Sequence, residues 1–216
     1  MALICLDLDN TLIHSDRCHT LAYNYALSKL NRRKVSPAFI FSLFGGPKSF
    51  VAEKLMPNAT KKELAILLDL HDTYLIRNTA RYARAIKGAK AAIHEIKKEH
   101  ELAVLSNSRH KTIIALLNSS GLKKSLFDVL IGYDDVKHSK PQPDEIFKAE
   151  KLLHHKASLM VGDSIYDILA GKRARVKTIG VLTGNYSRTA LLKYRPFKII
   201  PSISHLPAMI KKHNMV

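Results

Sequence analysis

Cysteine is scarce in this chain of 216 residues, which has only Cys5 and Cys18 and no CxxC pair. So few thiols exclude a disulfide framework and are typical of a reducing compartment. No apolar run approaches the length of a membrane span, and the first residues lack the basic region and cleavage site of a secretion signal. Internal repeats and low-complexity tracts are also missing. We therefore expect a cytoplasmic protein without a membrane partner.

Acidic residues are scarce as well, because 18 Asp and Glu stand against 35 Lys and Arg, for a formal net charge of +17. A surface of this sign attracts anions, including nucleic acids, anionic membranes and phosphorylated metabolites. The basic residues occur largely as scattered doublets, such as Lys61-Lys62, Lys123-Lys124 and Lys172-Arg173. No aromatic residues interleave with these doublets as a stacking platform requires. We interpret most of them as solvated surface, so a nucleic-acid partner is the less favoured hypothesis.

What the chain does have is an ordinary globular composition, 46% hydrophobic and 25% charged, with enough length for a large core. Short apolar runs alternate with helical patterns, which predicts an α/β fold with βαβ units in a doubly wound parallel sheet. After an opening strand, the expected strands are 102–105, 127–131, 158–161, 177–181 and 198–200. The expected helices are 89–99, 110–119, 144–154, one that ends near 174, and one that begins near 205.

Residues 15–86 differ from this pattern, because strand-like runs vanish and helical patterns replace them. Thr60 and Glu63 predict a capping box at the start of one of these helices. A helical block of this size is an insertion and not another βα unit. We expect a core domain from residues 1–14 and 87–216 and an all-helical cap domain from residues 15–86. The cap helices are expected near 18–31, 36–43, 48–55 and 61–80.

The stretch Leu6-Asp7-Leu8-Asp9-Asn10-Thr11-Leu12 ends an apolar run in two carboxylates. Acids at the end of a buried strand are costly unless they are paired or bind a cation, and ligands bind at that end of open α/β sheets. If the strand continues, Asp7 and Asp9 lie on the same side. This favours a cation site in which one carboxylate is a nucleophile and the other an acid/base. The alternative is a strand that ends in an Asp-Asn-Thr turn or a helix cap.

Three more predicted strand ends or loops carry polar side chains, and parallel strands bring such ends to one edge of the sheet. These side chains are Ser106, Lys140, Asp163 and Asp167. Separately, Ser106 or Asp163 could cap a helix, and Lys140 could be an ordinary loop cation. Together, carboxylates beside a lysine and a hydroxyl suit Mg²⁺ and a phosphoryl group.

Four segments, in this order and spacing, resemble the four motifs of the haloacid dehalogenase superfamily: Asp7-Leu8-Asp9-Asn10-Thr11-Leu12, Ser106-Asn107, Lys140-Pro141 and Gly162-Asp163-Ser164-Ile165-Tyr166-Asp167. The resemblance covers essentially the whole chain. It implies a Rossmann-like core, and the helical insertion resembles the C1-type cap of the superfamily. Gly180-Val181-Leu182-Thr183-Gly184 resembles the phosphoglycolate phosphatase-like branch.

The resemblance implies a role for each matching residue. Asp7 is the nucleophile that forms an aspartyl-phosphate, and Asp9 is the general acid and base. Lys140 neutralises developing charge. The phosphate-binding residues are Thr11, Ser106, Asn107 and Lys140. The implied Mg²⁺ ligands are Asp7, Asp9 through its backbone carbonyl, Asp163 and, in the outer shell, Asp167.

Two residues depart from the family pattern, and two more candidates for the site lie outside the four motifs. Asn10 and Arg175 replace glycines that relatives usually carry, and a left-handed Arg175 would cost on the order of 1 kcal/mol. His19 resembles a cap-linker histidine of related enzymes, with an ordinary helix histidine as the alternative. Lys48 could reach a substrate anion from the cap or could simply be solvated.

The resulting expectation is a Mg²⁺-dependent phosphatase that hydrolyses a small phosphomonoester, with a small phosphorylated metabolite as its partner. Asp9 favours phosphate over halide chemistry, because the dehalogenases of the superfamily lack an acid there. One alternative is a sugar-phosphate mutase on the same scaffold. Another is a non-catalytic basic module that binds nucleic acid, which the intact acidic motifs disfavour. Phosphoglycolate, a sugar phosphate, a nucleotide and pyrophosphate all remain open as substrates.

Overall fold

The computed structural model describes residues 1–213 and shows a six-stranded sheet in which every neighbouring pair is parallel. The strand order is β5-β4-β1-β6-β7-β8, so the chain winds outward in both directions from β1. The strands are β1 (Leu3–Asp7), β4 (Glu101–Ser106), β5 (Val129–Gly132), β6 (Ala157–Gly162), β7 (Lys177–Val181) and β8 (Lys198–Ile200). The predicted doubly wound parallel sheet is confirmed.

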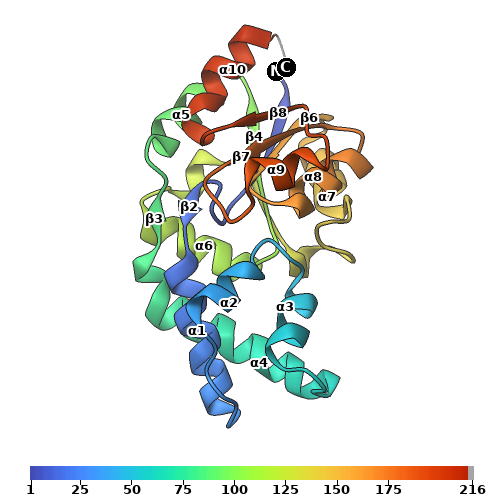
Figure 1. Cartoon of the computed structure of the whole chain (residues 1–216). Helices are drawn as coiled ribbons and strands as arrows, with labels where there is room; N and C mark the ends of the chain where they lie inside the picture. Colours follow the sequence, from blue (N-terminus) through green and yellow to red (C-terminus); the bar gives the residue numbers. More distant parts are fainter. Residues whose placement is uncertain (214–216) are drawn as a thin grey trace.

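Helices cover both faces of the sheet (Figure 1), because successive strand side chains point to opposite faces. Ile4 and Leu6 pack in the cluster that includes α5, α6 and α10, whereas Leu3 and Cys5 pack in the cluster that includes α7 and α8. A smaller cluster joins α8, α9 and β8. The helices are α5 (Ala89–Lys97), α6 (His110–Ser120), α7 (Asp144–Leu153), α8 (Ile165–Arg173), α9 (Arg188–Leu192) and α10 (Leu206–His213).

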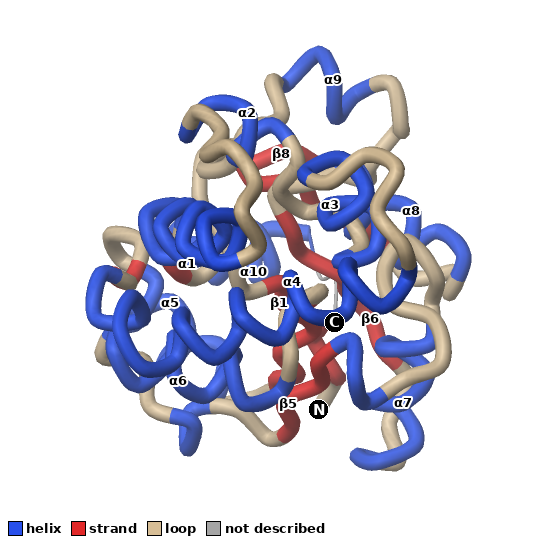
Figure 2. The backbone as a smooth tube through the Cα atoms, turned by 90° about the horizontal axis from the view of Figure 1, so that it is seen from below, coloured by secondary structure: helices blue, strands red, loops and turns tan. Residues whose placement is uncertain are grey.

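The helical segment between β2 and β3 forms a separate cluster of buried apolar side chains, to which Leu27, Ile40 and Leu67 belong. Figure 1 shows it beyond one end of the strands, and Figure 2 looks onto it with the sheet behind. The chain enters and leaves it through a short antiparallel pair, β2 (Ile13–His14) and β3 (Arg84–Ala85). Its helices are α1 (Asp16–Lys29), α2 (Pro37–Ser42), α3 (Lys48–Leu55) and α4 (Lys61–Tyr74).

Two local predictions for this helical segment have different outcomes. The capping box is confirmed, since Thr60 N donates to Glu63 Oε2 at 2.8 Å and Glu63 N donates to Thr60 Oγ1 at 3.3 Å. The helix expected over 61–80 is continuous in the structure over 61–79, but it is not an α-helix throughout. The α-helix ends at Tyr74 and widens into a π-helical turn, Leu75–Thr79. Leu75 belongs to the core cluster of the sheet and not to that of the helical segment, so the change of helix type lies where packing passes from one cluster to the other.

Two of the departures noted in the sequence have left-handed backbones. Asn10 has φ of 59° and Arg175 has φ of 61°. Asn tolerates this conformation well, whereas Arg at such a position costs on the order of 1 kcal/mol relative to Gly. Arg175 follows α8 directly after its C-cap residue, Ala174.

Candidate functional site

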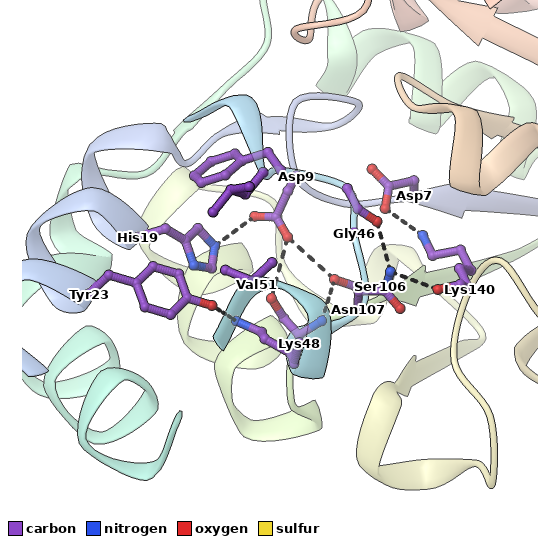
Figure 3. A pocket seen from close by; sticks show the side chains of 14 residues that line it. Asp7, Asp9, His19, Tyr23, Gly46, Lys48, Val51, Ser106, Asn107 and Lys140 are labelled. Carbon is purple, nitrogen blue, oxygen red and sulfur yellow. Dashed lines mark hydrogen bonds and ion pairs between the residues drawn. The ribbon is translucent and has the colours of Figure 1, made fainter. Parts of the chain in front are cut away.

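The carboxyl ends of β1, β4 and β6 meet at one edge of the sheet, the edge that faces the helical segment. Lys140, from the loop before α7, is buried at the centre of this edge. Its ammonium group donates to Asp7 Oδ1 at 2.6 Å, to Asp167 Oδ1 at 2.8 Å and to the Leu105 carbonyl at 2.8 Å. Burial lowers the pKa of Lys140, but the two carboxylates outweigh it and hold that pKa well above its ordinary value. The lysine is therefore a fixed positive charge beside Asp7 (Figure 3).

Asp7, Asp163 and Asp167 form a buried carboxylate cluster, with one ligand atom of each within 4.8 Å of the others. Burial raises the pKa of Asp7 to about 8, and burial together with Asp7 and Asp167 raises that of Asp163 well above its ordinary value. Three carboxylates against one ammonium leave two negative charges, which is the charge that one divalent cation neutralises. Oxygen ligands of this kind suit Mg²⁺. The residues present therefore fit the metal that the family resemblance implies.

Two glycines make room for this cluster. A Cβ atom on Gly162 would overlap the side chain of Asp167, and one on Gly184 would overlap that of Asp163. Asp167 is also the third residue of a capping box at the start of α8, where Ser164 Oγ donates to Asp167 Oδ2 at 2.6 Å. One of its oxygens thus binds the helix cap and the other binds Lys140. Ser164, and not Asp163, is the N-cap residue of α8.

Asp9 lies apart from the carboxylate cluster, because the chain turns sharply after β1. Leu12 N and Ile13 N both donate to the Leu8 carbonyl, and left-handed Asn10 donates back to the Ile13 carbonyl at 2.7 Å. The strand therefore does not continue through Asp9, although the side chains of Asp7 and Asp9 still reach one common pocket. Within residues 1–213 the Asp9 side chain is not part of the group that could hold a metal.

The Asp9 carboxylate is held by four side chains instead. Ser15 Oγ donates to Oδ1, His19 Nε2 lies 3.1 Å from Oδ1, and the Ser106 and Ser108 hydroxyls donate to Oδ2 at 3.3 and 3.4 Å. Burial raises the pKa of Asp9, but the charge and hydrogen bond of His19 and the hydrogen bond of Ser15 outweigh it. The pKa of Asp9 therefore lies well below its ordinary range.

The helical segment contributes a buried polar network to the site. His19 Nδ1 lies 3.1 Å from His71 Nε2, and His71 Nδ1 lies 2.8 Å from Asp72 Oδ1. Lys48 is buried and lies 3.4 Å from the Tyr23 hydroxyl and 3.9 Å from Asp72 Oδ1. Burial lowers the pKa of Lys48, but Tyr23, Asp72 and Asp9 outweigh it and raise that pKa above its ordinary value. His19 and Lys48 are therefore neither surface residues nor ordinary solvated side chains.

A pocket of about 50 Å³ lies between the core and the helical segment. Its wall includes the charged or titratable side chains of Asp7, Asp9, His19, Lys48 and Lys140, together with Ser106 and Asn107. These residues come from both sides of the pocket, as Figure 3 shows. Thr11 is buried but is not part of the pocket wall, and its hydroxyl has no hydrogen-bond partner within residues 1–213.

Contacts across the pocket hold the helical segment against the core. Asn107 Nδ2 donates to the Gly45 carbonyl at 2.8 Å and to the Lys140 carbonyl at 3.1 Å. Gly45 has φ of +82°, and a Cβ atom there would lie 2.6 Å from Ser164 Cβ. Arg109, two residues beyond Asn107, is ion-paired with Asp72 across the same interface at 3.1 Å.

The sequence analysis missed Ser15, Tyr23, His71, Asp72 and Ser108. Only Ser108 had a usable signal, because it follows Ser106 and Asn107 at the end of a predicted strand. Tyr23, His71 and Asp72 lie inside helices, where their spacing matches that of ordinary core or surface positions. Their role follows from the packing of α1 against α4, which brings the rings of Tyr23 and His71 to 3.8 Å between centroids.

The fold and the site define an α/β enzyme for phosphoryl transfer, with acidic and basic groups at the carboxyl edge of a doubly wound sheet. The profile of the haloacid dehalogenase-like hydrolases matches residues 4–181, and the chain belongs to this family. It is a phosphatase of that family. The resemblance drawn from the four motifs is thereby confirmed.

Several known proteins are similar to this chain over most of its length. Phosphoglycolate phosphatase of Aquifex aeolicus is 31% identical over 85% of the chain and 86% of its own length. Pyrophosphatase PpaX of Anoxybacillus flavithermus is 28% identical over 96% of the chain and 95% of its own length. A hydrolase structure from Pseudomonas syringae superposes with a TM-score of 0.86 at 22% identity, covering 99% of each chain. None of the helices within residues 1–213 is long and apolar enough to cross a membrane.

Proposed function

We propose that this phosphatase depends on Mg²⁺ and transfers a phosphoryl group first to Asp7 and then to water. The observation that supports this most directly is the shared position of Asp7, which belongs both to the carboxylate cluster and to the pocket wall beside Lys140. The buried free thiols of Cys5 and Cys18 support a reducing, cytoplasmic setting.

In the first step, a carboxylate oxygen of Asp7 attacks phosphorus, and the bond from phosphorus to the leaving oxygen breaks. The leaving oxygen takes its proton from Asp9. In the second step, water attacks phosphorus and gives a proton to Asp9, and the carboxylate of Asp7 is released. During both steps Lys140 neutralises the developing charge from beside Asp7, and Ser106 and Asn107 line the pocket that receives the phosphoryl group.

Asp7 and Asp163, with the backbone carbonyl of Asp9, would hold Mg²⁺, and Asp167 would orient Asp163 and Lys140 from outside this ligand set. When bound, the metal neutralises charge on the phosphoryl oxygens and favours the ionised form of Asp7. The ionised form is the nucleophile, and burial alone works against it. Lys140, 2.6 Å from Asp7, acts in the same direction as the metal.

Asp9 needs a proton for the first step, although its surroundings favour the carboxylate. His19 is the group that can supply one, because its Nε2 lies 3.1 Å from Asp9 Oδ1. We assign the proton of the first step to this Asp9–His19 pair. In the second step the low pKa of Asp9 suits its role, because the Asp9–His19 pair then accepts a proton from the water that attacks phosphorus.

The substrate class follows from Lys48, whose buried ammonium forms one side of the pocket. Its two partners are distant, at 3.4 Å for Tyr23 and 3.9 Å for Asp72, so it retains donors for a ligand. Because Lys48 lies across the pocket from the core, it suits a second anionic group on the leaving side of the substrate. Pyrophosphate and phosphoglycolate, which the names of the relatives mention, are compact and carry such a group.

The mechanism is tested with Asp7→Asn. This variant keeps the size of the side chain but removes the nucleophile, so we expect no phosphate release from pyrophosphate, phosphoglycolate or an aryl phosphate. Circular dichroism checks that the variant is folded, and chelation of Mg²⁺ in the native enzyme should abolish the same activity reversibly. Turnover by the folded variant would refute a nucleophilic role for Asp7. Isomerisation of a sugar phosphate without release of phosphate would instead favour the mutase alternative.

The role of Lys48 is tested with Lys48→Met, with Lys54→Met as the matched control. Lys54 lies on the same helix, α3, but is exposed and outside the pocket. A charged hydrogen bond contributes about 1.5 to 3 kcal/mol, so kcat/KM for pyrophosphate and phosphoglycolate should fall about 10- to 100-fold. Hydrolysis of an aryl phosphate, whose leaving group has no second anion, should change little. Equal losses on all three substrates would contradict a second-anion site at Lys48.

A further inference from the structure

The positive charge of this protein is concentrated in its last part. No Asp or Glu follows Asp167, whereas the 49 residues after it contain ten Lys and Arg. These residues account for more than half of the net charge of +17. The basic residues up to β8 are Lys172, Arg173, Arg175, Lys177, Arg188, Lys193, Arg195 and Lys198.

The topology brings six of these eight residues to one edge of the sheet. β7 and β8 begin at Lys177 and Lys198, and α8 and α9 run back from the carboxyl edge towards these starting points. The cations at the helix ends and those at the strand starts therefore lie together, at the edge remote from the catalytic pocket. We call this surface the basic edge; it consists of Lys172, Arg175, Lys177, Lys193, Arg195 and Lys198, all exposed.

The basic edge lacks the carboxylates that pair with surface cations elsewhere in the chain. Lys97, Lys98 and Lys156 each form an ion pair with an acidic residue. Within residues 1–213, no residue of the basic edge does so. Its contacts include the position of Lys177 over the ring of Phe197. Arg173 is not part of it, because its guanidinium donates to the Pro141 carbonyl beside Lys140. These cations repel one another and gain nothing from acidic neighbours.

Two arginines of the basic edge occupy backbone positions that favour glycine. Arg175 follows α8 with φ of 61°, and Arg195 follows α9 with φ of 49°. Glycine is the residue usually found in this conformation after a helix. His154 follows α7 in the same way, with φ of 57°. Attraction to the carboxyl ends of helices explains cations in a last turn, such as Lys172 and Arg173. It does not explain arginine in a left-handed conformation, or lysine at the start of two strands.

Aromatic side chains accompany these cations. Residues 193–198 read Lys-Tyr-Arg-Pro-Phe-Lys. In this segment, unlike at the basic doublets, aromatic residues do alternate with basic ones. The Phe197 side chain is 49% exposed, and Lys177 Nζ lies 5.6 Å from the centre of its ring. Cations with an exposed aromatic ring among them are typical of surfaces that contact the phosphates and bases of a single strand.

We propose that the basic edge binds the backbone of nucleic acid without sequence selectivity, while the catalytic pocket at the opposite edge remains open. A membrane surface is the less favoured partner, because within residues 1–213 no amphipathic helix with a continuous apolar face accompanies the cations between β7 and β8 to add apolar burial to their attraction for anionic lipids. The only helix that lies wholly between β7 and β8 in the described structure is α9, which has five residues. The proposal does not depend on the substrate of the phosphatase.

The test uses Arg175→Gly combined with Arg195→Gly. Glycine is favoured at both backbone positions, so the double variant should fold at least as stably as the native protein. The control is Lys61→Gln combined with Lys62→Gln, which removes the same charge from exposed positions at the start of α4. Neither pair belongs to the pocket wall, so phosphate release should be unchanged in both variants.

Binding is measured by fluorescence anisotropy with labelled single-stranded RNA, single-stranded DNA and duplex DNA between about 50 and 200 mM salt. We expect binding that weakens steeply with salt, and a loss of about 10-fold or more in the arginine variant only. Removing two phosphate contacts should also reduce the slope of log affinity against log salt by about 1.8 on duplex DNA. No binding at about 50 mM salt, or equal losses in both variants, would overturn the proposal. So would tighter binding to vesicles of phosphatidylserine and phosphatidylcholine than to nucleic acid.

Discussion

Gly45 is a point of close approach between the helical segment and the catalytic core, and Gly45→Ala tests whether that contact matters for activity. A Cβ atom there would lie 2.6 Å from Ser164 Cβ and 2.9 Å from Ser164 Oγ, whereas ordinary contacts begin near 3.4 Å. The helical segment and the core must therefore separate by about 0.8 Å at this contact in the variant. Ser164 cannot yield easily, because its hydroxyl donates to Asp167 Oδ2 at 2.6 Å.

The expected loss follows from this displacement. A misplacement of about 1 Å in an active site can cost about 100-fold in rate, so we expect kcat/KM to fall between about 10- and 100-fold. Alanine at a φ of +82° also strains the backbone by about 1 to 2 kcal/mol. In a chain of this length, that strain lowers Tm by about 2 to 8 °C.

Gly121→Ala separates the two effects. Gly121 also has φ of +82°, but a Cβ atom there would meet nothing within 4 Å. Both variants should lose similar stability in thermal unfolding, and only Gly45→Ala should lose activity in a phosphate-release assay. If the two variants are equally active, close docking of the helical segment through Gly45 is not needed for catalysis, and the reasoning fails.

Two further predictions concern buried charges of the core. Lys140→Met leaves the carboxylate cluster without its ammonium. In urea titrations with a chelator present, the free energy of unfolding should fall by about 3 to 5 kcal/mol relative to the native protein. Addition of Mg²⁺ should restore part of this loss. Glu145 is fully buried, and burial raises its pKa to about 7. Between pH 4.5 and 7 the folded protein keeps a proton on Glu145, whereas the unfolded chain, in which the pKa is 4.5, releases it. The free energy of unfolding should therefore fall by up to about 3 kcal/mol as pH rises from about 4.5 to 7. Glu145→Gln should remove that part of the slope, and an unchanged slope would contradict the assignment.

Much of the core was predictable because its apolar runs are bounded by polar residues that end each strand. The strand at Lys198–Ile200 and the helix at Lys48–Leu55 have the predicted bounds. β2 and β3 have two residues each and α9 has five, so none carries enough periodicity to be read from the sequence. These short elements depend on tertiary contacts: β2 and β3 exist only as partners of each other.

The candidate site was predictable only where a polar side chain stands at the end of a strand that the sequence itself indicates. Asp7 and Ser106 end buried strands and Asp163 directly follows one, and a parallel sheet brings such positions together. The surroundings of Asp9 could not be foreseen in the same way. A left-handed Asn10 turns the chain there, and the partners His19 and Ser15 come from beyond that turn. Lys48 had no distinguishing neighbour in sequence, because Tyr23 and Asp72 reach it only when α1, α3 and α4 pack together.

Asp7 and Asp9 are two residues apart, yet their pKa values shift in opposite directions, because burial and neighbouring carboxylates dominate at Asp7, whereas His19 and Ser15 outweigh burial at Asp9. Lys140, beside Asp7, belongs to the core. The cations that lower the pKa of Asp9, His19 and Lys48, both belong to the helical segment. Moving the helical segment away from the core removes His19 and Lys48 from Asp9. Burial, which raises the pKa of Asp9, is then less strongly opposed. Because Asp9 must give a proton in the first step, Gly45→Ala should therefore shift the alkaline limb of kcat/KM to higher pH as well as lower its maximum. If the maximum falls and the limb does not move, Asp9 is insensitive to the position of the helical segment, and its protonation is controlled within the core.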